Sequence, residues 1–202
     1  MTQDTIHYLA LGDSYTIGES VPVTESFPGQ WVQTLRQKGR NVAAPEIIAK
    51  TGWTTDELQA AIDRYHFRTD YDFVTLLIGV NNQYRGRSVE NYKPEFERLL
   101  QQAIRFAGND PAKVAVLSIP DWGVTPFAEG RNRQQIAAEI DQYNAANQEL
   151  AAKYHVHYIN ITQWTREAAA DNELLAADGL HPSGKEYKRW AEQLAVYFLS
   201  KY

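Results

Sequence analysis

Five short apolar runs, rich in β-branched or aromatic residues, alternate with longer stretches whose apolar residues recur at helical spacing. The runs lie at Ile6–Leu11, Val42–Ala49, Phe73–Ile78, Val114–Ile119 and Val156–Ile161. Most are almost continuously apolar, a pattern typical of parallel strands covered on both faces. Strands that alternate with helices predict a parallel sheet joined by right-handed crossovers. We therefore expect a three-layer α/β/α fold, flavodoxin-like, with a five-stranded parallel sheet in the order 2-1-3-4-5.

The stretches between the runs carry helix signals. Helices are expected at Phe27–Lys38, Asp56–Phe67, Ser88–Ala107 and Arg133–Tyr154, and from Ser183 to about Leu199. Capping boxes, in which a Ser or Thr is followed three residues later by Glu, open two of them at Thr54–Glu57 and Ser183–Glu186. Pro94 lies inside another, so the first turn of that helix is expected to be displaced or kinked.

Composition limits the class of protein. A chain of 202 residues with 44% hydrophobic residues suits one domain spanning 1–202. Its net charge of −5, without a block of like charges, argues against nucleic-acid partners. The absence of cysteine excludes disulfides and thiolate chemistry, and fits a reducing compartment. With no basic n-region and apolar leader at the start, and no long apolar window, a cytoplasmic protein without membrane insertion is expected.

The first apolar run ends in an unusual way, because residues 9–19 read LALGDSYTIGE. A serine at a strand end can cap a helix, bind a phosphate or act as a nucleophile. Ligands of parallel sheets bind beyond the carboxyl ends of the strands, so the other strand ends bear on the choice. Thr51-Gly52-Trp53 and Gly79-Val80-Asn81-Asn82 follow the second and third runs, and Asp178-Gly179-Leu180-His181-Pro182 precedes the last helix.

These segments together supply the groups that acyl transfer requires. Ser14 can be the nucleophile and His181 the base that takes its proton. Asp178, three residues before His181, can hold the imidazole in the required tautomer. The N–H groups of Ser14 and Gly52 and the side-chain amide of Asn81 can stabilise an oxyanion.

The four segments resemble the sequence blocks of the GDSL, or SGNH, hydrolase family. GDSYT is similar to the block around the family's nucleophile, KTGWTT to the second block, GVNNQ to the third and DGLHP to the last. The resemblance spans residues 12–182 in the family's order. It implies a flavodoxin-like hydrolase that cleaves esters or thioesters without a cofactor. It also implies Ser14, Asp178 and His181 as catalytic residues and Ser14, Gly52 and Asn81 as oxyanion donors.

Side chains beside these blocks are candidates for contact with substrate: Tyr15, Trp53, Asn82, Trp122 and Phe127. Asn82 stands where the family's third block often has Asp, and is expected to affect local hydrogen bonding or substrate choice. The basic Arg85 and Arg87 are expected to be solvated loop charges.

The sequence thus predicts a serine ester hydrolase of the carboxylesterase or acetylesterase type, with small-molecule esters and water as reactants. Lysophospholipase and acyl-thioesterase activities are alternatives within the same chemistry. A flavodoxin-like mononucleotide-binding module is an alternative from another class, although GDSYTIGE lacks the G-x-G-x-x-G phosphate loop. No metal site is expected: His155 and His157 should share one face of a strand, but no acidic residue sits beside them at ligand spacing. The pattern indicates no particular oligomeric state.

Overall fold

The computed structural model describes residues 4–202. Its strands are β1 (Tyr8–Asp13), β2 (Glu46–Lys50), β3 (Phe73–Leu77), β4 (Val114–Leu117) and β5 (His157–Ile159). They form one sheet in the order β2-β1-β3-β4-β5, and every pair of neighbours is parallel. The predicted strand order and direction are therefore confirmed.

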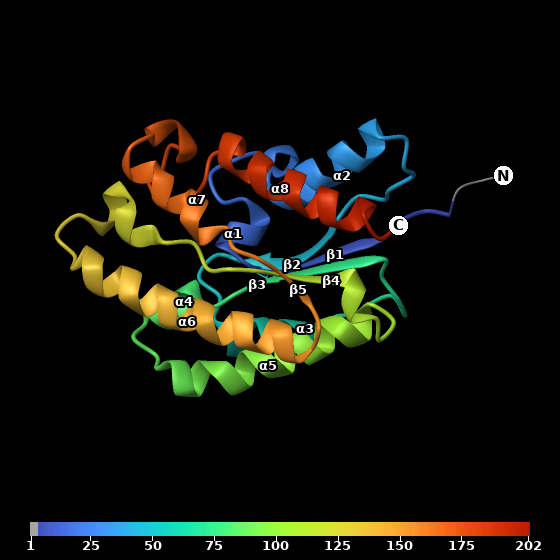
Figure 1. Ribbon diagram of the computed structural model, residues 1–202, viewed down its shortest axis with the longest axis horizontal. Coiled ribbons are helices and arrows are strands. Elements are labelled where there is room, and N and C mark those ends of the chain that lie inside the picture. Colours follow the sequence, from blue (N-terminus) through green and yellow to red (C-terminus); the bar gives the residue numbers. More distant parts are fainter. Residues whose placement is uncertain (1–3) are drawn as a thin grey trace.

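Helices cover both faces of the sheet (Figure 1). The α-helices are α1 (Ser14–Ile17), α2 (Phe27–Gln37), α3 (Thr55–Ile62), α4 (Val80–Tyr84), α5 (Val89–Phe106), α6 (Arg133–Lys153), α7 (Thr162–Arg166) and α8 (Gly184–Leu199). Helices α2 and α8 lie side by side on one face, and α3, α5 and α6 cover the other (Figure 1). In residues 4–202, no helix combines the length and the apolar character needed to cross a membrane.

The face under α2 and α8 is filled by aromatic side chains. The ring of Trp31 on α2 lies 4.5 Å from that of Tyr8, stacks on Phe73 at 5.1 Å and meets Phe198 of α8 edge-on at 5.3 Å. All four side chains are buried, and aromatic contacts of this kind add to the free energy gained by burying their area. This cluster attaches both helices to β1 and β3.

On the opposite face a buried tyrosine joins the sheet to two helices. The hydroxyl of Tyr92 on α5 donates to Asn147 Oδ1 on α6 at 2.7 Å, and it also lies 3.0 Å from the carbonyl oxygen of Ile78. Its ring also lies 4.5 Å from that of Tyr143 on α6. Tyr92 thereby fixes the backbone at Ile78, directly after β3 and just before the segment that carries Asn81.

Several helix boundaries differ from the prediction. The helix expected at Asp56–Phe67 ends at Ile62, and the chain then places Phe67 against Phe106 of α5, with ring centroids 4.3 Å apart. Pro94 does not displace the first turn of α5, which begins at Val89; Ser88 caps that helix by accepting a hydrogen bond from Asn91 N at 3.3 Å. Tertiary packing and capping therefore outweigh the local signals at these two places.

The two expected capping boxes have different outcomes. In the first, Thr54 N donates to Glu57 Oε2 at 2.9 Å, as predicted. In the second, Ser183 precedes α8, but its hydroxyl donates to the carbonyl of Glu173 at 2.6 Å. The carboxylate of Glu186 accepts from Trp190 Nε1 at 2.8 Å instead of from the cap. A buried indole N–H competes for this carboxylate because it would otherwise lack a partner.

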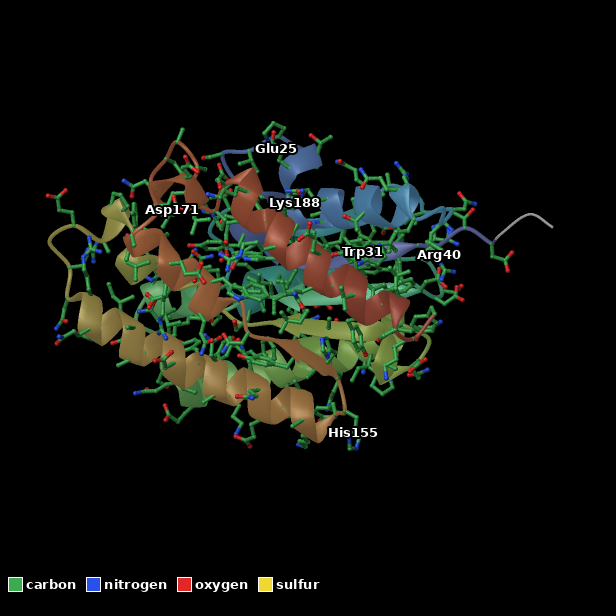
Figure 2. All side chains as sticks on the ribbon, turned by 45° about the horizontal axis from the view of Figure 1, so that its top comes forward. Glu25, Trp31, Arg40, His155, Asp171 and Lys188 are labelled. Carbon is green, nitrogen blue, oxygen red and sulfur yellow. The ribbon has the colours of Figure 1, made fainter. Side chains whose placement is uncertain are left out.

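His155 and His157 do not share a strand face, so this expectation was wrong. His155 has a φ of 57° and occupies the turn between α6 and β5, whereas β5 begins at His157. Figure 2 shows His155 on the outside of the molecule at that turn. His157 stacks on Tyr197 of α8, with ring centroids 3.7 Å apart.

Gly12 permits the close approach of α1 and β3 at the end of β1. A Cβ at this position would lie 2.1 Å from Thr16 Oγ1 and 2.4 Å from the carbonyl oxygen of Leu77. Because the second contact is with backbone, Gly12→Ala should lower the free energy of unfolding by about 3 kcal/mol. Gly39→Ala is the control: its φ is 79° with nothing near the new Cβ, so the loss should be about 1 kcal/mol. Urea titrations measure both, and equal losses would contradict the clash.

Candidate active site

The carboxyl end of β1 places Ser14 at the start of α1. Asp13 caps this short helix, and its Oδ1 accepts a hydrogen bond from Tyr15 N at 3.0 Å. The hydroxyl of Ser14 lies 2.9 Å from His181 Nε2, although the two residues are 167 positions apart in the sequence. Ser14 is 4% exposed and His181 6%. The side chains therefore meet in a partly desolvated position, where hydrogen bonds are stronger than in water.

The loop before α8 holds Asp178 against His181. Asp178 Oδ2 lies 2.6 Å from His181 Nδ1, and its Oδ1 accepts from the N–H groups of Leu180 and His181, each at 2.9 Å. Partial burial raises the pKa of Asp178, but the hydrogen bonds from His181, Ser20 and these N–H groups outweigh it and lower the pKa to about 2. The carboxylate is therefore ionised at neutral pH, and it favours the imidazole tautomer with the proton on Nδ1.

An open cleft of ≈ 160 Å³ lies beside the Ser14–His181 pair. Its lining residues are Ser14, Tyr15, Thr51, Gly52, Val80, Asn81, Tyr84, Trp122, Phe127, Leu180 and His181. Of the side chains expected to contact substrate, Tyr15, Trp122 and Phe127 are in this lining, whereas Trp53 and Asn82 are not. Residues from five separate chain segments thus converge on one cleft.

Gly52 adopts a left-handed backbone conformation with a φ of 82°, which glycine tolerates best. Arg85 fixes this turn, since its Nη2 donates to the carbonyl of Gly52 at 2.7 Å and also lies 3.3 Å from Glu57. Arg85 was expected to be a solvated loop charge, and this contact was not predicted. Arg87 was likewise expected to be a solvated charge, but its Nη1 forms an ion pair with Asp56 Oδ1 at 2.6 Å.

Asn81 lies on α4, a five-residue helix that was not predicted from the sequence. Its Nδ2 donates to the carbonyl of Trp53 at 3.0 Å and lies 3.5 Å from Asp13 Oδ2. These contacts hold the amide between the ends of β1 and β2. Trp53 therefore takes part through its backbone, although its side chain does not line the cleft.

Asn82 is fully buried, and its side chain is hydrogen-bonded to Thr55. Its Oδ1 accepts from Thr55 N at 3.1 Å, and its Nδ2 donates to Thr55 Oγ1 at 2.7 Å. It thereby satisfies an N–H group in the first turn of α3, which has no partner inside the helix. This position corresponds to the local hydrogen bonding expected for Asn82, not to contact with substrate.

One wall of the cleft is aromatic. The ring centroid of Tyr84 lies 5.3 Å from that of Trp122 and 6.1 Å from that of Phe127, and the centroids of Trp122 and Phe127 are 5.9 Å apart. Trp122 is buried and donates its Nε1 to Gln83 Oε1 at 2.8 Å, whereas Tyr84 and Phe127 are 45% and 47% exposed. Tyr84 was missed because the helical turn that places it one turn beyond Asn81 was not predicted.

Asp13 is fully buried between Ser14 and Asn81. Burial raises the pKa of its carboxyl to about 7, although the N–H of Tyr15 opposes this shift. Tyr15 is also buried, and burial together with the nearby carboxylates raises the pKa of its phenol. Within residues 4–202, no group of three or more His, Asp and Glu side chains is arranged to hold a metal ion.

The chain belongs to the GDSL-like lipase/acylhydrolase family, whose model matches residues 10–189. Hydrolysis of ester bonds is the activity that this membership implies. A comparison with curated protein sequences finds no match.

Solved structures share the fold at low sequence identity. A lipase/acylhydrolase from Enterococcus faecalis is 19% identical, with a TM-score of 0.74 over 97% of this chain and 96% of that one. Axe2, an acetylxylan esterase from Geobacillus stearothermophilus, is 16% identical, with a TM-score of 0.73 over 96% and 94%. The psychrotrophic esterase EstA from Pseudoalteromonas sp., inhibited by monoethylphosphonate, is 16% identical, with a TM-score of 0.66 over 98% and 97%.

The raised pKa of Asp13 should make the free energy of unfolding depend on pH. Below pH 4 the carboxyl of Asp13 is protonated in both the folded and the unfolded protein. Between pH 4 and 7 it is ionised only in the unfolded protein, so the free energy of unfolding of the wild type falls as the pH rises through this range. Asp13→Asn, which stays neutral and can still cap α1, should therefore be more stable than wild type at pH 8, by on the order of 2–4 kcal/mol. Urea titrations at pH 4 and pH 8 measure the difference.

Asp56 provides a control of opposite sign. Its hydrogen bond with Arg87 lowers its pKa to about 2, so its contribution to stability is present above pH 4 and is lost as the pH falls to 2. Asp56→Asn should lose stability at pH 8. If Asp13→Asn behaved in the same way, the carboxyl of Asp13 would not be the destabilising group.

Proposed function

We propose that this protein is a serine hydrolase that cleaves short-chain or acetylated esters through an acyl-enzyme. The observation that carries the proposal is the chain of contacts from Ser14 Oγ to His181 Nε2 and from His181 Nδ1 to Asp178, at 2.9 and 2.6 Å, beside an open cleft. A hydroxyl, an imidazole and a carboxylate in this order form the arrangement that activates a serine nucleophile.

In the first half-reaction Ser14 Oγ attacks the ester carbonyl while His181 Nε2 takes the hydroxyl proton. The carbonyl oxygen becomes an oxyanion, for which the N–H groups of Ser14 and Gly52 and the amide of Asn81 are the proposed donors. Asp178 stabilises the imidazolium that forms. His181 then gives its proton to the leaving alcohol, and the acyl group remains on Ser14.

In the second half-reaction a water molecule takes the place of the alcohol. His181 removes a proton from this water, the resulting hydroxide attacks the acyl carbon, and the same donors stabilise the second oxyanion. Collapse of this intermediate returns the proton to Ser14 Oγ and releases the acid. No redox step occurs, and the reaction needs only the ester and water.

The size of the cleft supports small substrates. Its ≈ 160 Å³ lies below the roughly 300–1,000 Å³ that ligand pockets usually offer. The aromatic wall of Tyr84, Trp122 and Phe127 offers an apolar surface to the group bound beside Ser14. We therefore favour short acyl groups over the long chains of a lysophospholipid or a fatty acyl thioester.

A ladder of p-nitrophenyl esters from acetyl to palmitoyl tests both parts of the proposal. Wild-type kcat/KM should be highest for the shortest chains, because longer ones exceed the cleft, and Ser14→Ala should lower the rate by at least about 10³-fold. Equal rates in Ser14→Ala and wild type would remove Ser14 as the nucleophile. An optimum at long chains would leave the chemistry intact but overturn the substrate class.

Asn81→Ala should lower kcat by about 10²–10³-fold if the side-chain amide stabilises the oxyanion. Asn81→Asp retains the shape but replaces the N–H donors with acceptors, so it should be impaired at least as strongly. Steady-state kinetics on the best ester of the ladder, with circular dichroism as the check on folding, measure the effect. A folded Asn81→Ala with near-normal kcat would exclude the amide from the oxyanion hole.

A further inference from the structure

Residues 18–20, which we call the strap, follow α1 directly and are bonded to it. The N–H groups of Gly18 and Glu19 both donate to the carbonyl of Ser14, the latter at 3.0 Å. Gly18 and Ser20 both have left-handed backbone conformations, with φ values of 77° and 66°. Glycine adopts this conformation freely, but a serine there is strained. Strain at a non-glycine residue beside a functional site is maintained by the contacts that surround it.

The contact that holds Ser20 is a hydrogen bond to Asp178, the carboxylate that contacts His181. Ser20 Oγ donates to Asp178 Oδ2 at 2.7 Å, the oxygen that also contacts His181 Nδ1 at 2.6 Å. The N–H donors to Asp178 Oδ1 belong to Leu180 and His181 on the same loop. Ser20 comes from 158 residues earlier in the chain, so it fixes Asp178 relative to α1 and the nucleophile.

The neighbouring residue of the strap reaches the second strand end. Glu19 accepts a hydrogen bond from the hydroxyl of Thr51, the residue immediately before Gly52. Thr51 and Gly52 both line the cleft. Three residues of the strap thus connect the carbonyl of Ser14, the turn of Gly52 and the carboxylate of Asp178.

We propose that the strap is a positioning device, in which Ser20 orients Asp178 toward His181 and Glu19 holds the turn of Gly52 through Thr51. This inference rests on the proposed function, because positioning matters only if these groups perform the reaction. Neither Ser20 nor Glu19 lines the cleft beside Ser14. Each acts through the group that it holds.

The two halves of the strap predict different kinetic effects. Loss of the Ser20 hydroxyl removes a hydrogen bond that lowers the pKa of Asp178, so the carboxylate attracts the imidazolium proton more strongly. The acid limb of kcat/KM should then move to higher pH, and kcat should fall. Besides His181, the titratable side chains of Tyr15 on α1 and Tyr187 on α8 interact electrostatically with Asp178, and these substitutions leave them in place.

Ser20→Gly and Ser20→Ala separate the hydrogen bond from the backbone strain. Both remove the hydroxyl, but only glycine relieves the left-handed conformation, so Ser20→Gly should have a higher Tm than Ser20→Ala. Both should lower kcat by about tenfold, with little change in KM and the same shift of the acid limb. Asn109→Gly is the matched control: Asn109 also has a positive φ, of 64°, in the turn after α5, and its substitution should leave kcat and the pH profile unchanged.

Thr51→Val and Thr51→Ser test the other half. Valine retains the shape of threonine but removes the hydroxyl that binds Glu19, so kcat should fall while the acid limb stays in place. Serine retains the hydroxyl and should restore kcat. The proposal is overturned if kcat follows Tm across the Ser20 variants, or if Thr51→Val and Thr51→Ser are equally active.

A measurement that does not depend on activity keeps this test separate from the proposed function. Proton NMR detects the hydrogen on Nδ1 of a histidine bonded to a carboxylate as a far-downfield signal, assigned here by its loss in His181→Ala. Ser20→Gly and Ser20→Ala should both shift this signal or speed its exchange with water, whereas Asn109→Gly should not. An unchanged signal in both Ser20 variants would overturn the positioning role, even if wild type hydrolysed no ester.

Discussion

The hydrogen bond between Ser14 and His181 depends on how β1 is held. This strand is paired with β2 on one edge and β3 on the other, and all six of its residues are buried. Its backbone groups are satisfied within the sheet, and its side chains are packed under helices on both faces. Its last residue therefore has a fixed position, and Ser14 begins the next turn from a rigid base. The loop that carries Asp178 and His181 is not part of a strand of the sheet. It is positioned by α8, which follows it, and by the hydrogen bonds of Asp178 with Ser20 and of His181 with Ser14.

Two carboxyl groups at this edge have opposite environments. Asp178 receives several hydrogen bonds, which lower its pKa to about 2, whereas burial raises the pKa of Asp13 to about 7. Below pH 7 the site therefore has an ionised carboxylate next to the imidazole and a largely neutral carboxyl next to Asn81. This division keeps negative charge away from the position where the oxyanion would form. Different environments that separate the pKa values of paired acids are a common way to assign them different tasks.

The sequence was sufficient for the features that depend on strong local periodicity. The parallel sheet and the long helices α5 and α6 follow from β-α alternation. The strand order was instead the expectation for a flavodoxin-like fold, and the grouping of Ser14, Gly52, Asn81, Asp178 and His181 rested on the four sequence blocks. Features that depend on tertiary contacts were not predictable: α4 has only five residues, Arg85 reaches a carbonyl 33 positions away, and Glu186 bonds to an indole. Asn82 and Trp53 adjoin site residues in sequence, but a helical turn directs Asn82 toward Thr55, and Trp53 contributes its carbonyl. Adjacency in sequence does not fix which way a side chain points.

The first and last residues that the structure describes, Asp4 and Tyr202, lie close together. Asp4 and Tyr202 line one cavity together with Arg40, which donates to the carbonyl of Tyr202 at 2.9 Å. Ile6, just before β1, lines the same cavity, and the C-terminus lies near the start of this strand (Figure 1). Ser14 and the cleft, in contrast, follow the carboxyl end of β1. A tether, a fused domain or a solid support attached at Tyr202 would therefore leave the mouth of the cleft facing solution. The geometry of a parallel sheet, whose strands all begin at one edge and end at the other, makes this protein suited to oriented attachment.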